Sequence, residues 1–355
     1  MTTPYSRLPA RNFWKLTVAG RAPGKLESLW RPGIPLAPTD RFATAGSCFA
    51  QHISRNLVAA GFSWTDSEPA PVWLSSEHAK QFGYGVFSFR TGNIYTPALL
   101  RQWIEIALGL QAPTDEVWEH DARFFDPLRP AIEPKGYASI DECLHARAYT
   151  LKSIRDSLSN IDVLIFTLGL TESWRDADTG IWYPMCPGTL AGTFDPVRHL
   201  FHNLTHDEVV ADIDRAFAHI REINAGARLI LTVSPVPLTA TATDAHVLVA
   251  TTHSKAILRA AAGTLAAMNP AIDYFPSFEI IAGHPSRGVF YDPNLRTVTP
   301  SGVSTVMEHF FAGLGAAPEA PAMSPALTDA PEDDERDVAC EEEILAAFAP
   351  REPGA

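Results

Sequence analysis

Two side chains that can act as nucleophiles, Ser47 and Cys48, follow Gly46 between two contrasting segments. Residues 40–45 predict a short strand of small and apolar side chains, and from Phe49 onward apolar residues recur at helical spacing. A turn of this kind places both nucleophiles at the positive end of a helix, which lowers the pKa of a thiol and stabilises an oxyanion. The alternative is a structural turn in which Ser47 caps the helix and Cys48 is buried against the sheet.

Polar residues also follow two later strands of the predicted sheet. The apolar runs 163–168 and 228–233 are typical of parallel strands buried on both faces. Gly169 and Glu172 follow the first run, and Ser234 follows the second. Because ligands bind outside the carboxyl ends of the strands in open α/β sheets, these turns and the Gly-Ser-Cys turn predict one shared site. Taken singly, each is equally consistent with an ordinary tight turn.

The elements between these turns indicate the fold class. Apolar periodicity predicts helices over 97–110, 138–160, 206–224 and 251–268, and a weaker strand over 272–275. Strands that alternate with helices predict a three-layer α/β/α sandwich with a mostly parallel sheet.

Three regions follow from the composition along the chain. Residues 1–38, which are rich in proline and aromatics, predict an N-terminal arm packed on the domain. Residues 39–315 are predicted to form the α/β domain. Within it, 62–98 predict a long functional loop and 112–137 predict a polar insert. Residues 316–355 predict an acidic, largely disordered tail with a possible short helix over 339–348. Such a tail is a candidate surface for a protein partner.

Charge and composition exclude several classes of function. The net charge of −13 and the lack of a basic run argue against nucleic-acid binding. We find neither a signal peptide nor an apolar run long enough to span a membrane. Four scattered cysteines predict reduced thiols in the cytoplasm. No phosphate-loop, dinucleotide or metal motif is present, so we expect neither a cofactor nor a metal.

The sequence Gly46-Ser47-Cys48-Phe49-Ala50 resembles the signature of the GSCFA-domain family, which is similar to the SGNH (GDSL-like) hydrolases. The stretches 91–96, 167–174, 234–238 and 273–279 resemble further family motifs in the same order. The resemblance implies an SGNH-hydrolase-like, flavodoxin-type fold.

The resemblance also implies roles for individual residues. Aligned on the glycine, Cys48 takes the nucleophile position, and we place it ahead of Ser47 because a thiolate is the better nucleophile at neutral pH. Gly92 and Asn93 match the second oxyanion block. Thr171 stands where the relatives have Asn, and its hydroxyl can donate one hydrogen bond to the oxyanion.

The last motif departs from the relatives. Where SGNH hydrolases carry Asp-x-x-His, this sequence has Asn294 and Thr297, so the orienting carboxylate and the base are both missing. His52, four residues after Cys48, and His284 are candidate replacements for the base, although an ordinary structural histidine is the competing interpretation of each. Arg296 is a candidate anion-binding residue. The expected substrate-binding positions are Gly46, Gly169, Glu172, Ser234, Asn294, Arg296 and Thr297.

These observations leave two main functions and one further hypothesis. The first is an esterase or O-acyltransferase that acts on a carbohydrate, glycoconjugate or small ester through an acyl intermediate at the Gly-Ser-Cys turn, with transfer in cytoplasmic polysaccharide synthesis favoured. The second is a ligand-binding module that has kept the pocket and lost the base. The third is an interaction protein that works through its acidic tail.

Overall fold

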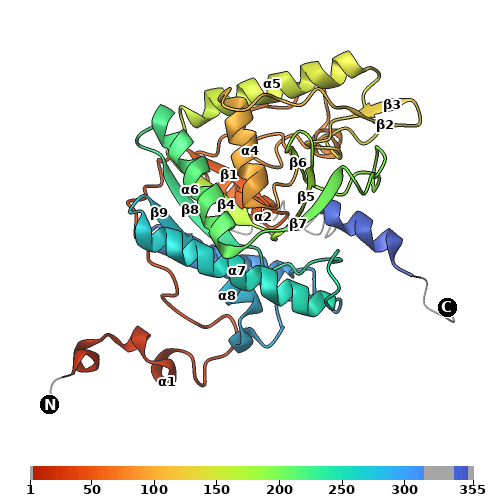
Figure 1. The fold of residues 1–355 in the computed structure, drawn as a ribbon. Coiled ribbons are helices and arrows are strands. Elements are labelled where there is room, and N and C mark those ends of the chain that lie inside the picture. The colour runs from red at the N-terminus through yellow and green to blue at the C-terminus, as the bar shows by residue number, and fades with distance from the viewer. Residues whose placement is uncertain (1–2, 316–339, 351–355) are drawn as a thin grey trace.

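A four-stranded parallel sheet forms the centre of the molecule in the computed structural model, which describes residues 3–315 and 340–350 (Figure 1). The strands are β1 (Phe42–Gly46), β4 (Val163–Leu168), β8 (Arg228–Val233) and β9 (Ile272–Phe275), in the order β1-β4-β8-β9. Every neighbouring pair is parallel, so all four carboxyl ends lie at one edge.

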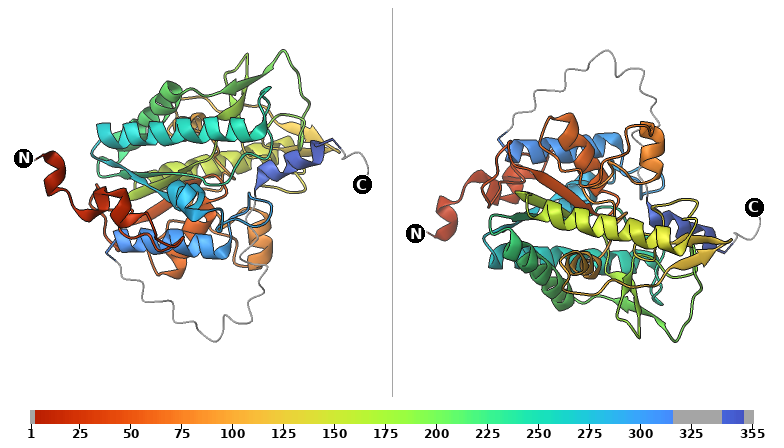
Figure 2. Two further views of the ribbon diagram at one scale, coloured as in Figure 1. Left: turned by 90° about the horizontal axis from the view of Figure 1, so that it is seen from below. Right: turned by 90° about the horizontal axis from the view of Figure 1, so that it is seen from above.

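Alternate residues of each strand face two separate helical layers, as expected from the pleat of a strand. Leu164 and Phe166 pack into a core with the helices α4 to α7, whereas Val163 and Ile165 pack into a second core with α2, α8 and α9. Figure 2 shows α6 and α7 on one side of the sheet and α9 on the other. This confirms the predicted three-layer α/β/α sandwich.

The helices that cover the sheet begin at recognisable capping residues. Thr205 and Glu208 form a capping box at the start of α6, and Pro97 opens α4 directly after the capping hydroxyl of Thr96. The helices are α1 (Trp14–Thr17), α2 (Ala50–Ala59), α3 (Ser76–Gln81), α4 (Pro97–Ala107), α5 (Ile140–Leu158), α6 (His206–Ile223), α7 (Val247–Met268), α8 (Ser277–Ala282) and α9 (Pro300–Gly313). Short 3-10 helices are η1 (Pro4–Arg7), η2 (Ala10–Asn12), η3 (His284–Ser286) and η5 (Glu341–Phe348).

Two small antiparallel sheets were missed by the sequence analysis. The stretch expected to be a polar insert contains the hairpin of β2 (Trp118–His120) and β3 (Arg123–Phe125), and the stretch expected to be a loop contains α3. A second sheet follows β4 and has the order β6-β5-β7, from β5 (Glu172–Asp176), β6 (Trp182–Tyr183) and β7 (His199–Asn203). Strands of two to five residues are too short to give a clear periodic pattern.

The two terminal segments contact the domain at different places. In the N-terminal arm, Trp30 is buried and stacks on Phe310 of α9 at 5.3 Å, and its Nε1 donates to Asp273. Of the acidic tail, only 340–350 are described, and η5 lies beside the β5-β7 sheet (Figure 1). The rest of the predicted tail, 316–339 and 351–355, lies outside the described residues. In the described ranges no helix combines the length and the apolar character that crossing a membrane requires.

Candidate active site

The Gly-Ser-Cys turn is fixed to the edge of the central sheet by backbone contacts. Gly46 has φ +134°, and a Cβ at this position would lie 2.3 Å from the carbonyl oxygen of Thr167. The same carbonyl accepts a hydrogen bond from the Ser47 N–H at 3.0 Å. Because only glycine allows this approach, β1 and β4 together set the position of Ser47 and Cys48.

A second segment, 92–95, bridges the ends of β1 and β4. The Ile94 N–H donates to the Gly46 carbonyl at 2.8 Å, and the Tyr95 carbonyl accepts from Gly169 and Leu170 at 3.0 and 3.1 Å. A Cβ on Gly169 would meet the Cβ of Ser47 at 3.0 Å, so these turns are in close contact. The fold therefore brings the two blocks that resemble an oxyanion site to the candidate nucleophiles.

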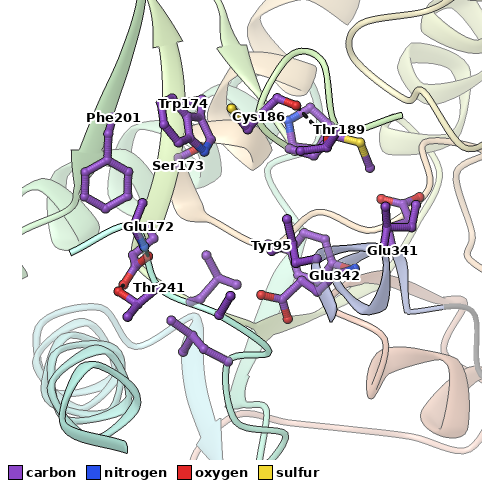
Figure 3. Close-up of a pocket in the computed structure, with 18 residues that line it drawn as sticks. Tyr95, Glu172, Ser173, Trp174, Cys186, Thr189, Phe201, Thr241, Glu341 and Glu342 are labelled. Carbon is purple, nitrogen blue, oxygen red and sulfur yellow. Dashed lines mark hydrogen bonds between the residues drawn. The ribbon is translucent and has the colours of Figure 1, made fainter. Parts of the chain in front are cut away.

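Two neighbouring cavities at this edge share part of their lining. The smaller is lined by side chains from all three strand-end turns and from α7, including Ser47, Cys48, Ser234 and Lys255. The larger has a volume of about 190 Å³ and lies under the β5-β7 sheet, where Trp174 and Phe201 contribute aromatic walls (Figure 3). Tyr95, Leu170, Leu238 and Glu342 line both cavities.

Lys255 is the functional candidate that the sequence analysis missed. It is 3% exposed, and its Nζ donates to the Gly169 carbonyl at 2.5 Å. Burial lowers the pKa of this ammonium group to about 8. A signal was present in the sequence, because Lys255 falls at helical spacing with Leu258 and Ala262, among the mainly apolar residues of the buried face of α7.

The C-terminal segment reaches the nucleophile through Cys340. The two sulfurs are hydrogen bonded, and the Arg296 guanidinium donates to Cys340 Sγ at 3.3 Å. The Cys48 hydrogen bond, and then Arg296, lower the pKa of Cys340 to about 6, although burial opposes this shift. The pKa of Cys48 is raised well above its ordinary value by its hydrogen bond to Cys340 and by burial. With the segment in place, Cys48 is therefore the thiol that donates and Cys340 is the thiolate that accepts.

The carboxyl group of Glu341 occupies the Gly92–Asn93 block. It accepts hydrogen bonds from the backbone and the side chain of Asn93, and a Cβ on Gly92 would lie 2.7 Å from its Oε1. Burial raises the pKa of Glu341 to about 8. The block thus binds a carboxyl oxygen with two N–H donors, and two such donors are what an oxyanion site requires.

Glu342 lies between two cationic side chains. Its Oε2 is 3.7 Å from Arg296 Nη2, and it lines the small cavity together with Lys255. Its backbone N–H donates to the Tyr95 hydroxyl at 3.3 Å. Burial raises the pKa of Glu342 to about 8, and nearby Cys340 raises it further.

The Asn294–Thr297 block forms a turn that presents Arg296. The Asn294 side-chain carbonyl accepts from the N–H groups of Arg296 and Thr297, each at 2.9 Å. Its amide donates to the Thr297 hydroxyl at 2.9 Å. The two side chains are therefore engaged with their own turn, and Arg296 is the side chain of this block that contacts Cys340 and Glu342.

Three predicted catalytic residues lie in other surroundings. His52 packs at the edge of Phe49, and burial lowers its pKa to about 4, so it is neutral. The helix α2 begins at Ala50, after Cys48, so the expected helical i, i+4 spacing does not apply. His284 stacks on Trp14 at 5.2 Å. The Thr171 hydroxyl donates to Asn203 at 2.5 Å.

Two predicted substrate-binding residues organise loops at the rim of the cavities. Glu172 accepts from the Thr241 hydroxyl at 2.6 Å and from the Ala242 N–H at 3.1 Å. Ser234 Oγ accepts from the Val236 N–H at 3.2 Å and faces the small cavity. Within 3–315 and 340–350, no three His, Cys, Asp or Glu side chains are grouped as a metal site would require.

Comparison with known proteins agrees with the motifs of this site. A search of curated proteins finds no match. A model of the GSCFA family matches residues 41–310, which include the Gly-Ser-Cys turn, Asn93, Lys255 and Arg296 and end before Cys340. The match covers well over half of the chain, so this protein belongs to the GSCFA family.

Proposed function

We propose that this protein is an SGNH-like esterase or O-acyltransferase that forms an acyl thioester at Cys48. The observation that carries the proposal is the carboxyl group of Glu341 on the donors of Asn93, beside Gly92. A carboxyl oxygen bound there marks the position that the oxygen of an ester carbonyl would take as it becomes negative during nucleophilic attack. The segment that carries this carboxyl group also brings Cys340 against the sulfur of Cys48, so oxyanion donors and nucleophile serve one site.

Lys255 is the group that we assign to proton transfer. It shares the small cavity with Cys48, and its lowered pKa allows it to hold or release a proton near neutral pH. This assignment replaces the missing Asp-x-x-His pair, and it does not require His52 or His284.

The proposed reaction has two half-reactions. The Cys48 thiol transfers its proton to neutral Lys255, and the resulting thiolate attacks the ester carbonyl, whose oxygen becomes negative on the Asn93 donors. The carbonyl re-forms as the C–O bond breaks, and the Lys255 ammonium returns the proton to the leaving alkoxide. An acceptor hydroxyl or water then attacks the thioester and gives its proton to Lys255, and the Cys48 thiolate leaves and is reprotonated.

The second half-reaction decides between hydrolysis and transfer. The aromatic walls of the larger cavity, Trp174 and Phe201, suit the stacking of a sugar ring, which supports a carbohydrate or glycoconjugate as the acceptor. Synthesis of a polysaccharide or glycoconjugate in the cytoplasm accords with four cysteines that are all free.

A ligand-binding module without turnover is the second candidate. Asn294 and Thr297 hydrogen bond to each other at 2.9 Å and offer neither a carboxylate nor an imidazole to the site. On this alternative, Arg296 and Lys255 hold a ligand that is released unchanged.

Acylation by 4-nitrophenyl acetate distinguishes these functions. We expect intact-protein and peptide mass spectrometry to find one acetyl group on Cys48 in the full-length chain, and none there in Cys48→Ala. An adduct at Ser47 that persists in Cys48→Ala and disappears in Ser47→Ala would transfer the role of nucleophile to the serine. Lack of any adduct at the turn in the wild type and in Cys340→Ala would favour the binding module.

A further inference from the structure

Two largely buried cationic side chains, Arg296 and Lys255, lie beside the candidate nucleophile. The Arg296 side chain is 17% exposed and Lys255 is 3% exposed. We infer that Arg296 forms a subsite, beside Lys255, for a carboxylate on the acyl group of the substrate, and that the segment Cys340–Leu345 occupies this subsite in the free protein. The inference rests on the proposed acyl chemistry and names the substrate class: half-esters of small dicarboxylic acids.

The first argument is electrostatic. A cation that is removed from water needs a counter-ion, and leaving it unpaired is strongly unfavourable. The C-terminal segment supplies anions to Arg296 through Glu343 at 3.1 Å and the Cys340 sulfur at 3.3 Å, and the carboxyl group of Glu342 lies 3.7 Å away. These contacts come from a segment that follows the matched family region. The domain therefore presents a cationic subsite, and a separate part of the chain neutralises it.

The second argument is the relative position of two carboxylates. Glu341 lies on the Asn93 donors, whereas Glu342 lies in the small cavity with Cys48 and Lys255. In Figure 3 the two side chains project from the same short helix at the rim of the larger cavity. Together they resemble the two ends of a dicarboxylic half-ester, with one carbonyl at the oxyanion block and one free carboxylate at Arg296.

The segment is anchored by apolar contacts that lie apart from the subsite. Ile344 and Leu345 are half-buried and line the larger cavity, whereas Phe348 of the same helix is 62% exposed. Aspartate at positions 344 and 345 would place negative charge against the apolar wall of the larger cavity and near Glu172. The substitution leaves Arg296 and Lys255 unchanged. The double substitution I344D/L345D should therefore release the segment, and F348D is its matched control.

Calorimetric titration with succinate and its neutral analogue succinamide tests the subsite in full-length protein. We expect I344D/L345D to bind succinate at least about tenfold more tightly than wild type or F348D, because one charge-assisted pairing with an external carboxylate is regained. Adding Arg296→Gln should remove this gain. Glu342→Ala provides a second variant with an opened subsite should the double variant be unstable.

Two results of the titration would overturn the inference. One is succinamide binding as tightly as succinate, and the other is an affinity for succinate that does not depend on Arg296. Equal affinity of wild type, I344D/L345D and Glu342→Ala would show that the segment does not occupy the subsite.

Hydrolysis of two matched esters separates this inference from the proposed function. With 4-nitrophenyl hemisuccinate and 4-nitrophenyl butyrate, I344D/L345D should prefer the charged ester by at least about tenfold in kcat/KM, and Arg296→Gln should abolish the preference. Turnover of both esters without preference would overturn the subsite and retain the acyl chemistry. Tight succinate binding without turnover of either ester would retain the subsite and overturn the proposed function.

Discussion

The sulfur of Cys48 is hydrogen bonded to the sulfur of Cys340, which belongs to a segment beyond the region that defines the family. Arg296 donates to the same Cys340 sulfur at 3.3 Å. The candidate nucleophile is thus held as a protonated thiol by the segment that covers it. Availability of Cys48 for chemistry therefore depends on whether this segment is docked.

Replacing Cys340 should make Cys48 more acidic. The hydrogen bond to Cys340 is the largest cause of the raised pKa of Cys48, and Cys340→Ala removes it along with a negatively charged neighbour. We expect the pH midpoint for alkylation of Cys48 by iodoacetamide to move to a lower value, as followed by mass spectrometry. Cys186→Ala, at the rim of the larger cavity, is the control and should leave the midpoint in place. A midpoint that is unchanged or higher in Cys340→Ala would contradict the assigned thiol–thiolate pair.

Docking of the segment should depend on pH through Glu341. Its pKa rises from the ordinary 4.5 to about 8 in the docked state, mainly because of burial. Because the pKa of Glu341 is higher in the docked state than in the released state, protonation of Glu341 stabilises docking. This stabilisation is fully present below about pH 4.5 and is lost as the pH rises through about 8. Glu341→Gln carries no such titration.

Hydrogen exchange of residues 340–349, corrected for intrinsic rates, measures this effect. The amides of this segment should be better protected from exchange in Glu341→Gln than in wild type, and this difference should be larger at about pH 8 than at about pH 5. The exposed neighbour Glu343, replaced by Gln, is the control. A difference between Glu341→Gln and wild type that is the same at both pH values would contradict the assigned titration.

Lys255 should be required for acyl transfer rather than for folding alone. Loss of a general acid–base group lowers rates by about 10²–10⁴-fold, which we expect for kcat/KM of ester cleavage in Lys255→Met. Because Lys255 must be neutral to take the Cys48 proton, the wild-type rate should rise with pH through a pKa of about 8, and this rising limb should disappear in the variant. Lys152→Met, which alters an exposed lysine on α5, is the matched control. Retention of the limb in Lys255→Met would assign it to another group.

The glycine of the turn should be needed for stability. A Cβ on Gly46 would lie 2.3 Å from the Thr167 carbonyl at φ +134°, so Gly46→Ala combines backbone strain with a clash and should cost about 3 kcal/mol or more. Gly109 also has positive φ, but a Cβ at that position would have no atoms within 4 Å. Gly109→Ala should therefore cost only about 1–2 kcal/mol. Urea unfolding of both variants gives the comparison, and equal costs would show that the clash is relieved.

The central sheet could be predicted because its strands carry their own signal. The runs that form β4 and β8 are mostly apolar, as expected of strands buried on both faces, and the predicted bounds agree with the structure. The short strands β5 to β7 had no such signal. The histidines of β7 are engaged in local hydrogen bonds, since His202 pairs with Glu208 and His199 accepts from the Asp195 N–H.

The composition of the site depends on contacts that sequence order does not reveal. The glycine-containing turns could be located because parallel strands must end at one edge. The position of Lys255 required knowledge of which face of α7 is buried, and the contact of Cys340 with Cys48 joins residues far apart in the chain. A disordered tail was the natural prediction for acidic residues, because their composition gives no sign of a cationic cavity elsewhere in the fold.

The rate at which Cys48 is acylated measures directly how the docked segment controls the nucleophile. Wild type, I344D/L345D and F348D, all full length, are mixed with 4-nitrophenyl acetate, and the acetyl group on Cys48 is followed with time by mass spectrometry. We predict that I344D/L345D acylates at Cys48 at least about tenfold faster than wild type, because the docked segment no longer holds the thiol protonated, and that F348D behaves as wild type. Equal rates in all three proteins, or an acetyl group that accumulates on residues other than Cys48, would contradict this control of the nucleophile by the segment.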